Sequence, residues 1–336
     1  RIVTVVASFV ALVGCGGALR STPSGSGAAA DAGGAVVATV RLPDYGTDVA
    51  TGADGRAYVA APGNKLVIVD PTAGTVAASI EVDGQPNAVA VTPDGRRAYV
   101  VDFFGEEVAV VDTVSAKQKV RLPMGTMQRP SLRPSAAASR DGARVYVANT
   151  AKDHLFVIDT AADVIKQELF LDFHPSGVAV RSDGAYVFVV GCQLSCVDGT
   201  LRILDATTYA TVGKVALKSV PTGIVVNPEG SRAYVANGRE ASVTVVNLAT
   251  QAALDDIPVG PEPAGIAMDG AGKSVYVTSF RDGTLTAITT VGNRVVGTAR
   301  VGSSPRAVVV NAAGTRAFVT HSTSTLTVVD LSRLGP

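Results

Sequence analysis

The chain repeats one short segment seven times, and this repeat limits the possible folds more than any other feature. Each copy places a turn glycine before a short apolar run, as in GADGRAYVA, TPDGRRAYVV and NPEGSRAYVAN. These glycines recur at intervals of 40, 47, 42, 46, 42 and 42 residues. They are Gly55, Gly95, Gly142, Gly184, Gly230, Gly272 and Gly314. Four short strands in a period of about 40 residues are typical of a propeller blade. The sequence therefore predicts an all-β, seven-bladed β-propeller of four-stranded antiparallel blades over residues 35–336.

The second copy illustrates the unit. A first apolar strand is predicted over residues 88–91, and the turn Pro93-Asp94-Gly95 follows it. Glycine adopts backbone angles there that other residues resist. A second strand is predicted over 98–101, a third over 108–112, and an amphipathic fourth strand ends the unit. No useful length of the chain has the periodicity of a helix.

The repeat resembles a known family. The segment Tyr234-Val235-Ala236-Asn237 and its copies are similar to the repeat of the YVTN (YncE-like) β-propellers, which are related to lactonase-type and cytochrome d1-type propellers. The resemblance also rests on the Pro-x-Gly start of the preceding strand, as at Pro221 and Gly223. It covers residues 35–336 and implies the fold and a binding module, without implying a reaction.

The ring needs a strand from the N-terminal part of the chain. The seventh unit has strands predicted over 307–310, 317–320 and 326–330, and its fourth strand is missing. Residues 35–42 show the alternation of a fourth strand and lie 40 residues before one. We therefore expect residues 35–42 to complete blade seven and to remove two exposed sheet edges.

The N-terminal segment is expected to direct export. Arg1 precedes an apolar run over residues 2–13, which is shorter than the roughly 20 residues of a spanning helix. Residues 1–14 are therefore predicted to be a signal peptide. Leu12-Val13-Gly14-Cys15 resembles the lipobox of bacterial lipoproteins, which implies cleavage before Cys15 and a lipid on that residue. The alternative is an ordinary signal peptide with an incidental cysteine.

Residues 15–34 form the predicted connection between the lipid and the propeller. They are rich in Gly, Ala, Ser, Thr and Pro, a composition typical of a flexible tether. An Asp after the lipidated cysteine favours inner-membrane retention in lipoproteins, whereas this chain has Gly16. The resemblance thus implies a cell-envelope protein anchored to the outer membrane and facing the periplasm or the cell surface.

Two insertions interrupt the repeat. One adds about four residues to the turn between the second and third strands of blade four, and the other adds about five around residues 123–134. In a propeller such turns and the links between blades emerge on one face. Loops on a rigid scaffold often carry function, so this face is the predicted binding face. Neutral drift of surface loops is the alternative.

The two remaining cysteines lie in the first insertion. An even number of cysteines remains, Cys192 and Cys196, and export implies an oxidising compartment. Both points favour a structural disulfide. A redox-active pair is the alternative, although the spacing is not C-x-x-C and no basic residue lies between them.

Candidate ligand-binding residues are the histidines, arginines, aromatic residues and one glutamate expected on the same face. Those chosen are His174, His321, Arg129, Arg133, Phe103, Phe104, Arg239, Phe280, Arg281 and Glu262. Tyr45 and Arg306 are expected beside them. Aromatic rings next to arginines suit an anion, a glycan or a peptide carboxylate.

The predicted function is a membrane-anchored binding or scaffolding module whose partner is an envelope protein, a glycan or a small molecule. The sequence contains no nucleophile elbow, zinc, haem or phosphate-loop motif, so no catalytic residue, metal or cofactor is assigned. The alternative is a propeller-type lactonase or lyase that combines His174 or His321 with Glu262 or Asp282 at the central channel. Equal counts of 29 basic and 29 acidic residues argue against nucleic-acid binding. A monomer is expected.

Overall fold

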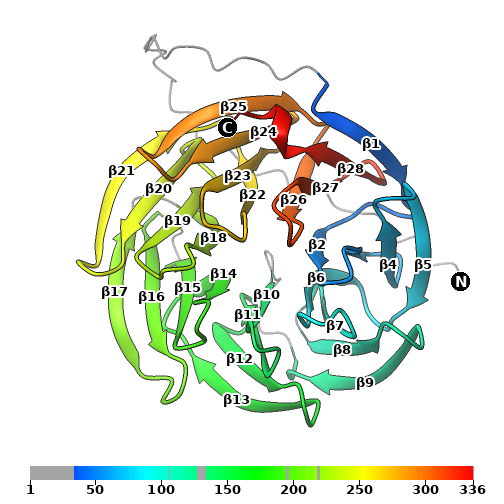
Figure 1. Ribbon diagram of the computed structural model, residues 1–336. Coiled ribbons are helices and arrows are strands. Elements are labelled where there is room, and N and C mark those ends of the chain that lie inside the picture. Colours follow the sequence, from blue (N-terminus) through cyan, green and yellow to red (C-terminus); the bar gives the residue numbers. More distant parts are fainter. Residues whose placement is uncertain (1–33, 105, 127–133, 194–196, 218–219, 336) are drawn as a thin grey trace, which may run out of the picture.

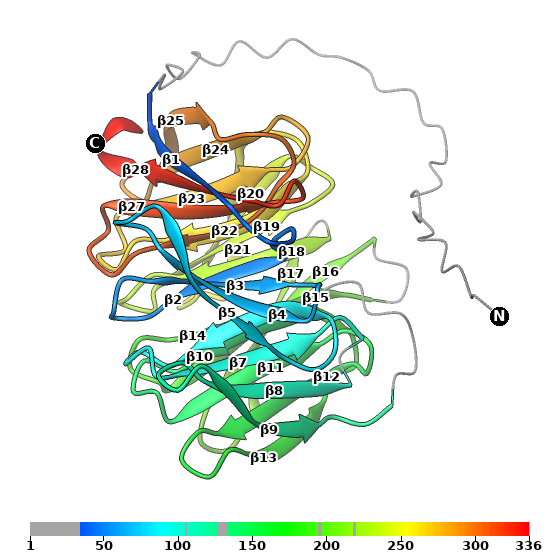
Figure 2. The same ribbon diagram turned by 90° about the vertical axis from the view of Figure 1, so that its right-hand side faces the viewer.

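Seven four-stranded antiparallel sheets stand around a central axis (Figure 1), which confirms the predicted seven-bladed β-propeller. The computed structural model describes residues 34–104, 106–126, 134–193, 197–217 and 220–335. The side view in Figure 2 shows the blades stacked around the ring. Within these ranges, no helix has the length and apolar character needed to cross a membrane.

Each of the first six blades is one continuous stretch of chain that runs from the inside of the ring outward. The strands of blades one to three are β2 (Asp48–Thr51), β3 (Ala57–Ala61), β4 (Lys65–Asp70), β5 (Thr75–Glu81); β6 (Pro86–Val91), β7 (Arg97–Asp102), β8 (Glu107–Asp112), β9 (Lys117–Pro123); β10 (Ser135–Ala138), β11 (Arg144–Asn149), β12 (His154–Asp159) and β13 (Val164–Phe170).

The strands of blades four to six are β14 (His174–Val180), β15 (Tyr186–Cys192), β16 (Gly199–Asp205), β17 (Thr211–Leu217); β18 (Pro221–Val226), β19 (Arg232–Asn237), β20 (Ser242–Asn247), β21 (Ala252–Pro258); β22 (Pro263–Met268), β23 (Ser274–Ser279), β24 (Thr284–Thr289) and β25 (Arg294–Arg300). Blade seven contains β26 (Pro305–Val310), β27 (Arg316–His321), β28 (Thr325–Asp330) and β1 (Val36–Arg41).

The turn glycines adopt the backbone conformation that the repeat predicts. Gly95 has a φ of 72°, in the left-handed region, and its N–H donates to the carbonyl of Thr92 over 2.8 Å. Such a φ is strained for residues with a Cβ. The turn returns the chain from β6 to β7, and the predicted second strand over 98–101 lies inside β7.

Strand β1 closes the ring as predicted. It pairs antiparallel with β28, from Val36 opposite Val329 to Arg41 opposite Thr325. Backbone hydrogen bonds extend this pairing at both ends, because Asp330 N–H donates to the carbonyl of Ala35 and the N–H of Leu42 donates to Ser324. The first and last strands of the propeller therefore share one sheet (Figure 1).

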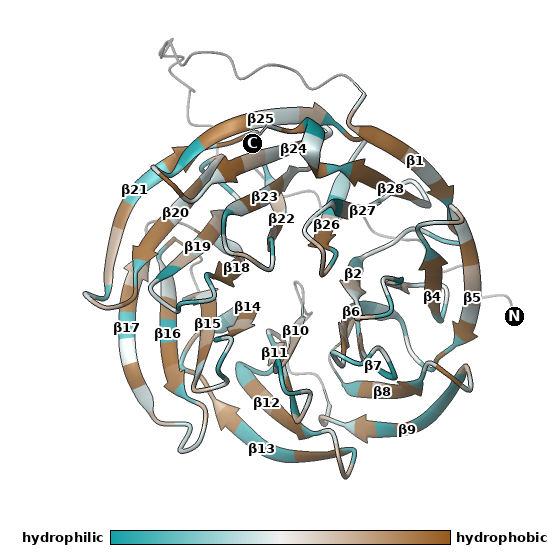
Figure 3. Ribbon diagram, in the orientation of Figure 1, coloured by the Kyte–Doolittle hydropathy of each residue, from teal (hydrophilic) through white to brown (hydrophobic). Residues whose placement is uncertain are grey.

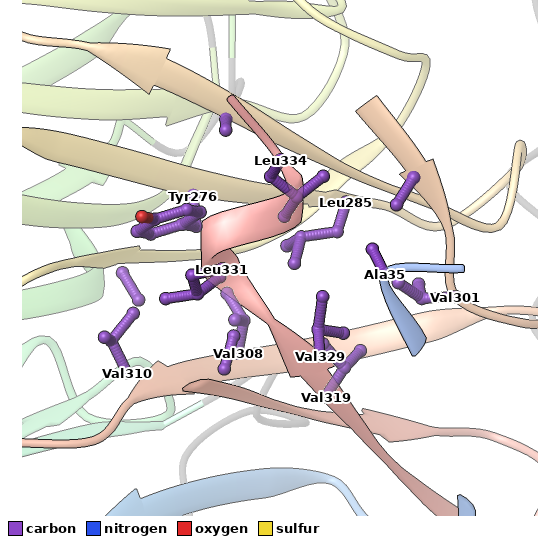
Figure 4. Packing of buried hydrophobic residues seen from close by; sticks show 14 residues of the cluster. Ala35, Tyr276, Leu285, Val301, Val308, Val310, Val319, Val329, Leu331 and Leu334 are labelled. Atoms are coloured by element: carbon purple, nitrogen blue, oxygen red, sulfur yellow. The ribbon is translucent and has the colours of Figure 1, made fainter. Parts of the chain in front are cut away.

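The core lies between blades, where apolar side chains of adjacent sheets pack on one another. Figure 3 shows bands of hydrophobic residues on the strands around the ring. At the junction of blades six and seven, the short 3-10 helix η1 (Leu331–Arg333) covers the core, with Leu331 and Leu334 packed near Tyr276 and Val329 (Figure 4). The C-terminal segment thus covers the apolar core between blades six and seven.

Tyrosines of the second strands bind neighbouring blades together. The side chain of Tyr99 is buried, and its hydroxyl donates to the Asp163 carboxylate of blade three over 2.7 Å. The same carboxylate accepts bonds from Arg97 over 3.1 Å and Lys119 over 3.0 Å. Tyr234 makes the equivalent contact with Asn293 of blade six.

Candidate functional site

The inner strands begin where the second strands end, so both sets of loops lie on one face of the ring. In blade four, His174 at the start of β14 pairs with Cys192 at the end of β15. In blade six, Pro263 pairs with Ser279 in the same way. We call this the link face, because the links between blades also reach it.

A central channel runs between the seven inner strands, and its cavity has a volume of about 650 Å³. This volume lies within the range of small-molecule sites. The wall is mixed: it contains apolar residues such as Val49, Val178 and Ile224 and polar residues such as Asn87 and Ser135. Its described charged residues are Asp48, Arg140 and Arg306.

Hydroxyl groups at the start of the inner strands connect successive blades. Thr47, Ser176 and Thr222 each donate to the carbonyl of the proline that begins the next inner strand, over 3.2, 2.6 and 2.9 Å. These hydroxyls are therefore used by the fold. At these three junctions the hydrogen bonds join the starts of neighbouring inner strands on the link face.

Arg306 is the cation at the link-face rim of the channel. Its guanidinium carbon lies 5.6 Å from the centroid of the Tyr45 ring and 5.9 Å from that of Phe280, and its Nε donates to Ser322 over 2.8 Å. Burial lowers the pKa of the guanidinium, and no described carboxylate lies within ion-pair distance of it. Arg306 thus combines a partly desolvated charge, two aromatic rings and no acidic partner among these residues.

Asp48 is the anion near the same rim. Its carboxylate accepts a hydrogen bond from the backbone N–H of Val89 in blade two over 2.9 Å and another from Val49 over 2.9 Å. Burial raises the pKa of this carboxyl to about 6. Within the described ranges, no Lys or Arg side chain forms an ion pair with it. The carboxylate therefore sits in the seam between blades one and two without a compensating positive charge.

The repeat shows that Asp48 is an exception. The matching residues of the other six blades, judged by their pairing with the second strand, are all small: Ala88, Ser135, Gly177, Gly223, Gly265 and Ala307. At Gly265 a Cβ would lie 2.6 Å from the Arg306 carbonyl of the next blade. Small residues let adjacent inner strands approach, and only blade one places a carboxylate there.

His321 does not belong to this site, contrary to the sequence-based expectation. It is 1% exposed, its Nδ1 lies 3.0 Å from the Ser303 carbonyl, and its Nε2 lies 2.9 Å from the Thr327 hydroxyl. Burial lowers the pKa of the imidazole and favours the neutral form. The ring has an internal structural role and no nitrogen left for a ligand.

The other charged candidates are engaged with one another. His174 is partly buried, and its Nδ1 bonds to the Asp153 carboxylate. Glu262 forms an ion pair with Arg281, and both side chains are exposed. Among the described residues, His174 thus bonds to Asp153 and Glu262 bonds to Arg281, which is not the pairing on which the lactonase alternative depends.

The aromatic and remaining basic candidates lie on the link face away from the Arg306 rings. Phe103 and Phe104 follow β7, and their rings contact edge to face with centroids 5.4 Å apart. Phe103 is 37% exposed. Arg239 is exposed in the turn between β19 and β20. Of the aromatic residues expected on this face, Tyr45 and Phe280 contact Arg306.

Several predicted residues lie outside the described ranges. They are Arg129, Arg133, Cys15 and Cys196. Cys192, at the end of β15, is disulfide-bonded, and its predicted pairing with Cys196 stays a prediction. Within the described ranges, no group of three His, Cys, Asp or Glu side chains is placed to hold a metal ion.

Comparison with known proteins supports the fold. No family model matches the chain, and no curated protein matches it. Among solved structures, Kuenenia stuttgartiensis hydrazine synthase superposes with a TM-score of 0.77 at 19% identity, covering 92% of this chain and 99% of that one. The Myceliophteria thermophila Cps50 (Swd1) β-propeller domain gives 0.70 at 13% identity, covering 88% and 98%. At these identities the likeness shows the propeller fold alone.

Proposed function

We propose that this chain is a binding module of the bacterial cell envelope that holds anionic ligands at Arg306 on the link face. The main observation in its favour is the position of the Arg306 guanidinium beside the Tyr45 and Phe280 rings. No described carboxylate forms an ion pair with it. Arginine forms strong charge-assisted bonds with carboxylates and phosphates. A partly buried cation with no acidic partner gains more from such a ligand than an exposed, paired arginine does.

Hexanoate tests this proposal, because it joins a carboxylate to an apolar chain that suits the apolar residues of the channel wall. We expect Arg306→Gln to weaken hexanoate binding about tenfold or more, since a hydrogen bond to a charged group contributes about 1.5–3 kcal/mol. Isothermal titration calorimetry measures the change. Arg96→Gln is the control and is expected to bind as the wild type does, because Arg96 is exposed between β6 and β7 and does not line the channel. Equal affinity of wild type and Arg306→Gln would remove Arg306 from the site.

The second part of the proposal is the lipid anchor on Cys15. Its support is the lipobox-like segment before that residue. Cys15→Ser is expected to abolish incorporation of labelled palmitate and to move the protein from the detergent phase to the aqueous phase of a detergent partition. A Cys15→Ser protein that stays in the detergent phase would show that another segment anchors it.

The lactonase alternative has less support. In its favour, the Asp153 carboxylate bonds to His174 Nδ1 and orients the imidazole ring. Its proposed carboxylate Glu262 is paired with Arg281, however. Lactone hydrolysis that His174→Ala abolishes would favour this alternative.

A further inference from the structure

The two opposite charges at the link-face rim of the channel are not paired with each other. Asp48 begins β2 and Arg306 is the second residue of β26, and these inner strands are neighbours around the ring. Tyr45, three residues before Asp48, contacts the Arg306 guanidinium. Both charged residues line the same cavity, yet no ion pair joins them.

Their separation follows from what holds each of them. The Asp48 carboxylate is turned towards blade two by the Val89 N–H, whereas Arg306 is held on the side of blades six and seven by Phe280 and Ser322. The two charges are therefore held by different partners in different blades. A single small anion at Arg306 leaves Asp48 without a cation.

Asp48 is half-buried, and a partly desolvated carboxylate without a cation is costly to the fold and is more frequent at functional sites than elsewhere. At Asp48 the cost is specific to one blade, because the six equivalent positions hold Gly, Ala or Ser. The carboxylate bonds to the Val89 N–H of blade two, but the other seams close without a charged residue at this position, so the fold does not require its negative charge. A positive group supplied by a ligand would compensate it.

We infer that the channel binds a zwitterionic ligand, whose carboxylate lies on Arg306 and whose ammonium group lies at Asp48. This inference rests on the proposed anion site at Arg306 and adds the second charge of the ligand. The ligand class is an amino acid or short peptide in which several bonds separate the two charges. The apolar residues of the channel wall accommodate the connecting carbons.

Matched pairs of probes test the ammonium site at Asp48 separately from the carboxylate site at Arg306. Butanoate is compared with 4-aminobutanoate, and hexanoate with 6-aminohexanoate, by isothermal titration calorimetry on the whole protein. We expect at least one amino acid to bind tenfold or more tightly than its matched carboxylate. In Asp48→Asn this ratio is expected to fall to about one. In Arg96→Gln, which changes an exposed residue between β6 and β7 outside the channel lining, it stays as in the wild type. Pentylamine, which lacks the carboxylate, is expected to bind more weakly than 6-aminohexanoate.

The outcomes separate the two proposals. If the carboxylates bind in an Arg306-dependent manner and neither amino acid gains over its partner, the zwitterion inference is wrong and the anion site stands. A gain that persists in Asp48→Asn places the ammonium elsewhere and also overturns the inference. If neither hexanoate nor 6-aminohexanoate binds, both proposals fail together.

Discussion

A chain that starts at Asp44, and so lacks β1, is expected to unfold at a markedly lower guanidinium concentration than the full propeller. It loses the ladder between β1 and β28 and the buried side chains of Ala35, Val40 and Leu42, which are 1–4% exposed. Burial of a Val or Leu side chain contributes about 1.5–3 kcal/mol. The expected loss is therefore about 5 kcal/mol, and it includes the exposure of Leu326 and Val328 at a new sheet edge.

The transition should also become less cooperative, because blade seven is the closure of the ring and loses one of its four strands. Denaturation followed by circular dichroism gives the midpoint and the slope. A chain that starts at Asp31 keeps every described contact of β1 and is the control. A shortened chain with the midpoint and slope of the control would mean that β1 does not hold the ring closed.

The fold could be predicted because the same pattern of turns and strands occurs seven times in the sequence. A turn glycine, an apolar second strand and a following polar turn recur with nearly constant spacing, so each copy supports the others. The closing strand could also be predicted from the sequence, since residues 35–42 have the spacing of a fourth strand. Pairing partners in this sheet are far apart in sequence, yet the missing strand of blade seven left one candidate.

The site could be predicted only in part, because it depends on which way side chains point. The expectation of arginine next to aromatic rings is met at Arg306, Tyr45 and Phe280. His321 has the right position along its strand, but its ring turns into the core between Ser303 and Thr327. The sequence pattern predicts that a residue lies at the end of a strand, but it does not predict whether the side chain points into the core or towards the channel.

Asp48 was missed although the sequence contained a signal for it. Aligning the seven copies on their turn glycines places Asp48 against Gly, Ala or Ser in all six other copies, because each of these residues lies seven positions before its glycine. A charged residue at a position that is otherwise small is a departure from the repeat. Loop length alone, which we used to find departures, does not register substitutions inside a strand.

Asp48→Asn is expected to stabilise the protein at pH 8 by at most about 3 kcal/mol, because solvent in the channel still reaches this residue. The folded carboxyl has a pKa of about 6, against 3.8 for the ordinary group. The folded state therefore holds a proton between pH 3.8 and 6 that the unfolded state releases. Wild-type stability falls as the pH rises through this window, and the full cost of the charge is present above it.

The pH profile distinguishes this mechanism from a general effect of the substitution. The difference in urea unfolding free energy between Asp48→Asn and wild type should be largest at pH 8 and should shrink towards zero near pH 3, below both pKa values, where Asp48 is protonated in both states. Asp183→Asn is the control, because Asp183 is exposed, is paired with Arg181 and has a lowered pKa. A gain for Asp48→Asn that is the same at both pH values would show that the amide improves packing. Absence of any gain at pH 8 would mean that the carboxylate is already compensated, and then no vacancy for a ligand's ammonium group exists at Asp48.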